Sequence, residues 1–156
     1  MTFKLSQRSK DRLAGVDADL VAVVHHAITV TEVDFGVICG LRTIEEQKEL
    51  VAKGASKTMK SKHIDGKAVD LMAYIGSRGS WELNVYDEIA DAMKEGAKAL
   101  GVGVRWGAAW HLPDIREWNG TMEDAMNAYI DLCRTRGRRP FIDAPHFELV
   151  ASHLTM

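Results

Sequence analysis

The sequence predicts an α+β fold, with a small, mostly antiparallel sheet flanked by helices. Segments with helical spacing of apolar residues are interleaved with runs in which apolar residues alternate, as they do along a strand. The strand-like runs are short and the helical segments cluster early and late, which favours this class. With 156 residues, 46% of them hydrophobic and 27% charged, the chain suits one soluble domain over residues 1–156.

The first predicted helix follows Asp17 or Asp19, either of which would cap it. One face of this helix is apolar and consists of Leu20, Val21, Val24, Ala27 and Ile28. The segment 33–39 then alternates along its length, which is typical of a strand, and Gly40 ends it.

A second helix is predicted after Thr43, because Glu46 stands three residues later and completes a capping-box pattern. Gly54 marks its end near Lys53. The next expected elements are a polar loop at 55–65, a strand at 67–73 and a turn-rich loop at 76–81.

In the second half of the chain, predicted helices and strands again follow one another. Gly101 and Gly137 mark the ends of its two predicted helices. The predicted elements are a long helix from Asn84 as N-cap to Leu100, a strand at 102–106, a helix at 122–136 capped by Thr121, and a last strand at 145–150.

Composition excludes several classes of function. The net charge is −2, so no general basic excess points to nucleic acid as a partner. The N-terminus has no apolar signal segment and no apolar run reaches the ~20 residues of a membrane span, so we expect synthesis in the cytoplasm without stable membrane insertion. Cys39 and Cys133 lack the spacing of a zinc knuckle and are expected to be buried thiols.

Asp70 has an unusual position, because it stands in the middle of a predicted apolar strand. An ionised carboxylate cannot be buried cheaply and needs a cation, hydrogen-bond donors or a metal ion. His63 lies in the loop just before, and Gly66 permits a tight return that would bring His63 alongside Asp70. From the residues alone, an arginine partner for Asp70 and an exposed His63 stay possible.

A histidine and an aspartate are two suitable zinc ligands, and a catalytic zinc site has three protein ligands plus a water. The candidates for the third ligand are His25, His26, His111, His146 and His153. We favour His146, because Pro145 stiffens its approach and Asp143 lies three residues earlier, near enough to reach a metal-bound water. His25 and His26 are adjacent in a helix and point in different directions.

The stretch 61–70 resembles a motif of the zinc peptidases that include D-alanyl-D-alanine carboxypeptidases and the vancomycin-resistance D,D-dipeptidases. That motif is S-x-H-x-x-G-x-A-x-D. It is matched without departure by Ser61, His63, Gly66, Ala68 and Asp70.

The second motif of that family, an acid three residues before a histidine, is matched by Asp143 and His146. An aspartate at this place resembles the phage L-alanyl-D-glutamate endopeptidase branch, the endolysins. The segments 40–47 and 3–21 are similar to that branch too. The resemblance covers nearly the whole chain and implies a Hedgehog/D,D-peptidase-like fold.

The resemblance implies that His63, Asp70 and His146 hold one Zn²⁺, with a water as the fourth ligand. Asp143 would then be the general base for that water and pass the proton to the leaving amine. Arg42 stands at the arginine position of the family and would stabilise the oxyanion or hold a substrate carboxylate. An ion pair between Arg42 and Asp70, or with one of two glutamates of the following helix, is the alternative role.

Four further residues are candidates with an open alternative. Ser61 would contact substrate or order its loop, and Glu148 would steady a metal ligand or be exposed. Trp106 and Trp110 would line the cleft against sugar or peptide, or belong to the core. The branch commonly has Trp-Gly-Gly-Asp-Trp here, whereas this chain has alanine at 108 and 109, which departs from the family's loop.

The basic cluster of Arg134, Arg136, Arg138 and Arg139 would offset a helix dipole or attract the protein to an anionic envelope. The leading functional prediction is a monomeric zinc endopeptidase that cuts peptidoglycan stem peptides between L-alanine and D-glutamate during phage lysis, after a holin releases it from the cytoplasm. The alternatives are a D-Ala-D-Ala peptidase and a non-catalytic wall-binding or virion module. A metal nuclease lacks support from the charge.

Overall fold

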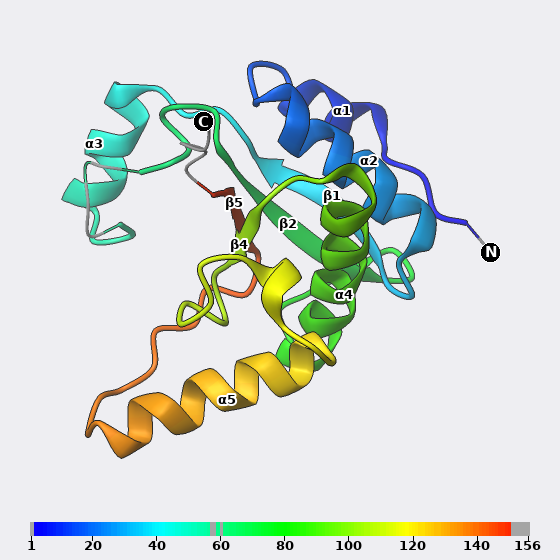
Figure 1. The fold of residues 1–156 in the computed structure, drawn as a ribbon. Coiled ribbons are helices and arrows are strands. Elements are labelled where there is room, and N and C mark those ends of the chain that lie inside the picture. The colour runs from blue at the N-terminus through cyan, green and yellow to red at the C-terminus, as the bar shows by residue number, and fades with distance from the viewer. Residues whose placement is uncertain (1, 57–58, 60, 151–156) are drawn as a thin grey trace.

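The computed structural model describes residues 2–56, 59 and 61–150. Its sheet is antiparallel at every strand pair, as predicted. The strands are β1 (Asp34–Cys39), β2 (Ala68–Ile75), β3 (Arg78–Ser80), β4 (Val104–Trp106) and β5 (His146–Leu149). Their order is β1-β2-β5-β4, and β3 pairs with the far end of β2 (Figure 1).

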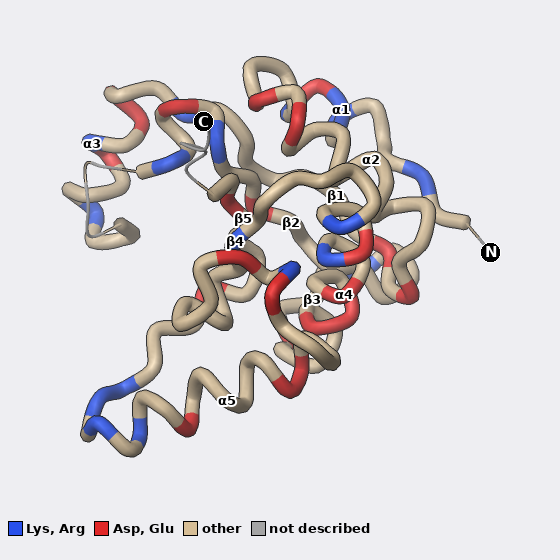
Figure 2. The backbone as a smooth tube through the Cα atoms, in the orientation of Figure 1, with Lys and Arg blue, Asp and Glu red and all other residues tan. Residues whose placement is uncertain are grey.

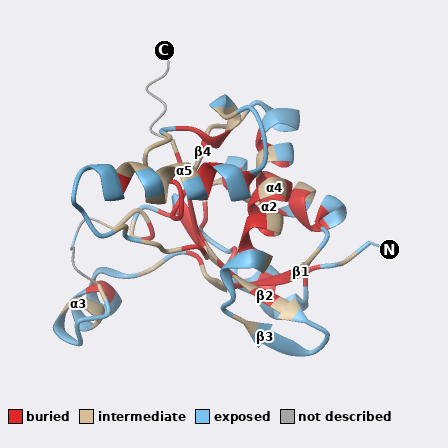
Figure 3. Cartoon of the chain, turned by 90° about the horizontal axis from the view of Figure 1, so that it is seen from below, coloured by how far each residue is buried: buried red, intermediate tan, exposed pale blue. Residues whose placement is uncertain are grey.

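Helices α2 (Ala18–Val30) and α4 (Leu83–Leu100) cover one face of this sheet. The other helices are α1 (Gln7–Arg12), α3 (Ile44–Ala52), the 3-10 turn η1 (Ile115–Glu117) and α5 (Met122–Thr135). The buried residues of α2 and α4 turn toward the sheet, and exposed residues lie on their outer sides (Figure 3). In both views α3 lies at the periphery (Figures 1 and 3).

Strand β2 is the centre of the sheet and has two unlike faces. Its residues Val69, Leu71 and Ala73 are wholly buried in the core under α2 and α4. The alternate residues Asp70, Met72 and Tyr74 are only half-buried. Because successive side chains of a strand point to opposite faces, the carboxylate of Asp70 lies on the face away from the core.

The capping predictions are largely confirmed. Asp17 caps α2, and Thr43 and Glu46 form the predicted capping box of α3. Thr121 caps α5. The prediction of Asn84 as a cap is wrong, because the N-cap is Glu82, two residues earlier, which makes no side-chain capping bond.

Besides the 3-10 turn η1, two short elements were not predicted from the sequence. Residues 78–80 of the turn-rich segment form β3, which pairs with β2 through a tight turn at Gly76. Residues 7–12 form α1, capped by the side chain of Ser6. Within the described residues, none of the helices has the length and apolarity that a membrane crossing requires.

Candidate metal centre

The loop before β2 carries His63 to the open face of the sheet. Gly66 adopts a left-handed conformation (φ +70°), and its N–H donates to the carbonyl of His63 at 3.2 Å, so the loop turns back tightly. The backbone N–H of Arg42 donates to the same carbonyl at 3.0 Å. His63 is buried, and its Nε2 lies 3.3 Å from Oδ2 of Asp70. The predicted return at Gly66 and the meeting of His63 with Asp70 are both confirmed.

Asp70 joins two histidines from distant parts of the chain. Its other carboxylate oxygen, Oδ1, lies 3.3 Å from Nδ1 of His146. The two residues are Cα partners in the ladder between β2 and β5, so sheet register brings them together. The imidazole rings of His63 and His146 lie with centroids 5.2 Å apart. The three predicted ligands therefore meet at one carboxylate.

Each histidine has a second partner that fixes which ring nitrogen faces Asp70. Nδ1 of His63 lies 2.9 Å from the carbonyl of Gly40 and donates to it, which leaves Nε2 facing Asp70. Nε2 of His146 lies 2.8 Å from Oε1 of Glu148, which leaves Nδ1 facing Asp70. Such partners orient histidine ligands in metal sites. The structure thus places Glu148 beside His146 and half-buried, not exposed.

Asp143 enters the site on a tight turn before β5. Its N–H donates to the carbonyl of Gly107 at 2.7 Å, and its carbonyl accepts from the N–H of His146 at 3.0 Å. A Cβ at Gly107 would lie 2.2 Å from that Asp143 carbonyl oxygen, so only glycine permits this approach. The ligand atoms of Asp70, Asp143 and His146 all lie within 4.8 Å of one another.

Arg42 borders the centre without filling it. Its Nη2 lies 3.9 Å from Oδ2 of Asp70, which is a long ion pair. Its Nη1 donates to Oε1 of Gln47 at 2.7 Å and lies 3.5 Å from Oγ of Ser61. Ser61 also accepts from the N–H of His63 at 3.2 Å, so it orders the loop. Gln47 is wholly buried and was not predicted as a site residue.

Cys39 belongs to a second group of possible ligand atoms, with His63 and Asp70, all within 4.8 Å of one another. The expectation of a buried structural thiol is wrong for this residue, because it is half-buried beside the site. Its Sγ lies 3.3 Å from Nη2 of Arg42 and 3.7 Å from Nδ1 of His63. A β-bulge in β1 brings it opposite Asp70. Burial would raise the pKa of Cys39, but His63 and Arg42 lower it.

The comparisons with known proteins agree with this geometry. The sequence profile of a family described as phage L-alanyl-D-glutamate peptidase matches residues 1–150. The chain belongs to this family. The L-alanyl-D-glutamate peptidase of Escherichia phage T5 is 33% identical over 115 residues, which cover 71% of this chain and 84% of that enzyme. That of Listeria phage A118 is 37% identical over 70 residues, 45% of this chain and 24% of the relative.

A solved structure shows the same fold. The crystal structure of the Serratia marcescens L-Ala D-Glu endopeptidase ChiX superposes with a TM-score of 0.69 at 33% identity, covering 94% of this chain and 90% of that one. The predicted α+β class and the resemblance to the phage L-alanyl-D-glutamate peptidases are therefore confirmed. The prediction of a peptidoglycan endopeptidase is confirmed at the level of the family.

The loop in which this member departs from the common family sequence is packed, not open. Ala108 and Ala109 are wholly buried. Trp106 is wholly buried too, and its indole N–H donates to the carbonyl of Ala144 at 2.7 Å. The expectation that Trp106 contacts substrate is therefore not supported, because its ring supports the turn that carries Asp143. The half-buried Trp110 lies nearer the centre, with its ring 5.7 Å from that of His146.

The other candidate histidines lie away from the centre. His25 is exposed on α2, and Nε2 of His26 lies 3.9 Å from Glu95. His111 stacks on Tyr129 with ring centroids 5.7 Å apart. His153 lies outside the described residues.

The charges of the centre depend on the bridging carboxylate. Burial would lower the pKa of both histidines, but the hydrogen bonds with Asp70 raise the pKa of His63 to about 10 and, with help from Glu148, that of His146 to about 9. Burial would raise the pKa of Asp70, yet the two histidines hold it well below its usual range. The metal-free centre is therefore a carboxylate held between two imidazolium groups.

We expect metal binding to displace these protons, because a ligand nitrogen must be deprotonated. At pH 7 both histidines are charged without metal, so binding of one zinc ion should release close to two protons, and the apparent affinity should fall as the pH falls. Calorimetric titration in two buffers of different ionisation enthalpy measures the number of protons released per zinc ion bound. Release of no protons at pH 7 would contradict the charged pair.

Proposed function

We propose that this peptidase cleaves the bond between L-alanine and D-glutamate in peptidoglycan stem peptides with a zinc ion held by His63, Asp70 and His146. The observation that carries this assignment is the convergence of the two histidines on the carboxylate of Asp70. Two imidazole nitrogens and one carboxylate are common ligands of catalytic zinc. Each imidazole is already oriented by a partner on its other nitrogen.

Cys39 is left out of the proposed ligand set on geometric grounds. Its sulfur lies nearest the Nδ1 side of His63, whereas the nitrogen that faces Asp70 is Nε2. Nδ1 is engaged with the carbonyl of Gly40. We assign the thiol to the shell around Arg42 and His63.

Bound there, zinc would act as a Lewis acid on the scissile carbonyl and lower the pKa of a water toward ~7. Asp143 accepts the proton of the attacking water and delivers it to the leaving amine. Burial and the charge of Asp70 raise the pKa of Asp143, which suits a group that must both take and return a proton.

Arg42 stabilises the negative charge that develops on the carbonyl oxygen, or binds a carboxylate of the substrate. The guanidinium is pre-oriented by Gln47, which is wholly buried, and by the sulfur of Cys39. The distance from the guanidinium to Asp70 is too long for a hydrogen bond, so N–H donors of Arg42 remain for the substrate. Gln47 is a positioning residue in this scheme, and Ser61 stays a proposed substrate contact.

Two alternatives are less well supported. A D-Ala-D-Ala peptidase would use a similar centre, but the family profile and the relatives named above are L-alanyl-D-glutamate peptidases. A non-catalytic wall-binding or virion module would be expected to have lost part of the ligand set, and here the predicted ligands and the acid converge.

The biological setting that fits this activity is lysis of a phage-infected cell. We propose that the enzyme acts as a monomer, accumulates in the cytoplasm and reaches the wall after a holin opens the membrane. Figure 2 shows Lys and Arg gathered at the far end of α5, where Arg134 to Arg139 lie. These cations would favour approach to an anionic cell envelope.

The test uses purified peptidoglycan and the purified chain, with and without a chelator. We expect new L-alanine C-termini and D-glutamate N-termini by mass spectrometry, lost with the chelator and restored by zinc. Release of free D-alanine would favour the first alternative. Absence of any chelator-sensitive cleavage would favour the non-catalytic module.

A further inference from the structure

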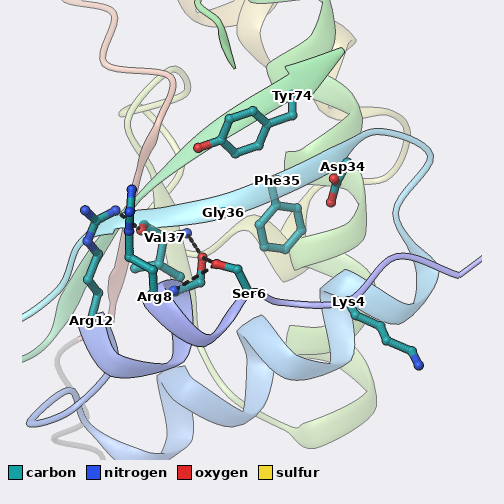
Figure 4. A pocket seen from close by; sticks show the side chains of 10 residues that line it. Lys4, Ser6, Arg8, Arg12, Asp34, Phe35, Gly36, Val37 and Tyr74 are labelled. Atoms are coloured by element: carbon teal, nitrogen blue, oxygen red, sulfur yellow. Dashed lines mark hydrogen bonds between the residues drawn. The ribbon is translucent and has the colours of Figure 1, made fainter. Parts of the chain in front are cut away.

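A polar cavity of about 390 Å³ lies beside the outer edge of β1. It is bounded by α1, by β1 and by Tyr74 of β2, and its lining includes three cations, Lys4, Arg8 and Arg12 (Figure 4). One acid, Asp34, lies toward the opposite end from the two arginines. The arginine end of the cavity therefore carries an excess of positive charge.

Two of these cations, Arg8 and Arg12, lie close together at one end of the cavity. Arg8 and Arg12 are four residues apart on α1, so their side chains are neighbours, and Figure 4 shows the guanidinium groups side by side. Arg12 donates one hydrogen bond to the carbonyl of Val37 at 3.0 Å. Among the described residues, no carboxylate forms an ion pair with either arginine. Two adjacent like charges favour an anion that bridges them.

Tyr74 adds a hydroxyl donor to the same end of the cavity. In Figure 4 its ring lies over β2, and its hydroxyl points toward the side on which the guanidinium groups lie. Gly36 makes this position possible, because a Cβ there would lie 3.1 Å from Cε2 of Tyr74 and 3.0 Å from Oγ of Ser9. A phenolic hydroxyl and two guanidinium forks are the donors that a carboxylate accepts best.

The cavity continues the face of the sheet that holds the metal centre. Tyr74 and Asp70 are four residues apart on β2 and point to the same, open face, so they lie about 13 Å apart along the strand. That length corresponds to at most about four residues of extended peptide, and Arg12 lies nearer to Asp70, because it contacts the carbonyl of Val37, a residue that pairs with Leu71. Of the two sides of an L-alanyl–D-glutamate bond, the D-glutamate side carries the free carboxylates of the stem peptide, because the L-alanine side is joined to the sugar.

We propose that Arg8, Arg12 and Tyr74 bind the C-terminal carboxylate of the stem peptide, on the D-glutamate side of the scissile bond. This assignment rests on the proposed function, since it takes Asp70 as the place of cleavage. The cavity then makes the enzyme prefer stem peptides with a free C-terminus over those blocked by cross-linking.

The test compares two synthetic stem peptides, each of L-alanine, γ-linked D-glutamate, L-lysine and D-alanine. One ends in a carboxylate and the other in a carboxamide. We expect kcat/KM of the zinc-loaded enzyme to be about 10-fold or more higher for the carboxylate, mainly through KM, since hydrogen bonds to a charged group are strong.

Arg8→Gln is the decisive variant, because the exposed side chain of Arg8 makes no hydrogen bond or ion pair with the described residues, so we expect the variant to fold normally. We expect Arg8→Gln to bring the ratio of kcat/KM for the carboxylate peptide over the carboxamide peptide close to one. Tyr74→Phe should lower this ratio in part. Lys10→Gln is the matched control, because Lys10 is an exposed cation of the same helix outside the cavity. Equal kcat/KM for both peptides, or an unchanged preference in Arg8→Gln, would overturn the proposal.

Direct binding separates this proposal from the peptidase assignment. If the enzyme cleaves neither peptide, the proposed function fails, and calorimetry with the zinc-loaded chain still decides the cavity. Tighter binding of the carboxylate peptide that depends on Arg8 would support it. Arg8-dependent binding of poly(glycerol phosphate), with no difference between the two peptides, would assign the cavity to a phosphate-bearing wall polymer instead and overturn the proposal.

Discussion

Asp143→Asn is expected to lower kcat by about 10²- to 10⁴-fold, the usual contribution of a positioned general base, while zinc stays bound. Asparagine preserves the shape of the side chain, and the two hydrogen bonds that hold the turn use backbone atoms of this residue. The variant should therefore fold normally. Steady-state cleavage of a stem peptide gives kcat, and elemental analysis of the dialysed protein gives the zinc content.

The pH dependence supplies a second measurement for the same residue. Asp143 must be ionised to accept a proton, and burial together with Asp70 raises its pKa above 3.8. The activity of the parent enzyme should thus fall as the pH drops through that raised pKa, and the residual activity of Asp143→Asn should lack this step. Asp131→Asn, an exposed acid on α5, is the matched control and should retain full kcat. A parental kcat in Asp143→Asn would contradict the role of Asp143 as the general base.

The meeting of His63 with Asp70 could be predicted from the sequence because its signals are local. A carboxylate inside an apolar strand needs a partner wherever that strand lies in the fold. The nearby glycine and histidine then limit which partner is within reach, and the left-handed Gly66 does bring His63 to Asp70. The capping box of α3 is equally local, since Thr43 and Glu46 contact one another within a single helical turn.

The residues that surround the ligands could not be predicted because their roles depend on register. Cys39 reaches His63 only through the bulge of β1, which no local pattern indicates. Gln47 contacts Arg42, five residues earlier, across the N-terminus of α3. Its one sequence signal is a polar residue at a helical position that proves to be wholly buried.

For Trp106 the sequence left two roles open, contact with substrate and packing in the core. The structure buries the ring beneath the turn at which Gly107 lets Asp143 approach the backbone. β3 was missed because three residues are too few to show alternation, and their glycine and serine are typical of turns.

Asp70→Asn is expected to cause the largest loss, with activity reduced by about 10³-fold or more, since the metal contributes several kcal/mol to transition-state stabilisation. The amide cannot carry the charge that both histidines contact. The pKa of each histidine should then fall toward its ordinary value of 6.5, because the interaction with Asp70 raises both. We expect the variant to lose both bound zinc and activity. The zinc content after dialysis measures the first loss, and the rate of stem-peptide cleavage measures the second.

Glu148→Gln should give a graded, smaller effect in the same assays. Glu148 orients His146 from the nitrogen opposite Asp70, and loss of such a partner typically costs 10- to 100-fold in metal affinity or activity. Asp65→Asn, an exposed acid in the same loop as His63, removes the same charge and should have no effect. If Asp70→Asn kept its zinc and its activity, the metal would not be held where the two histidines meet. The effects should thus decrease from Asp70→Asn, which removes a proposed metal ligand, to Glu148→Gln, which removes a partner that orients a ligand, to Asp65→Asn, which removes only a charge.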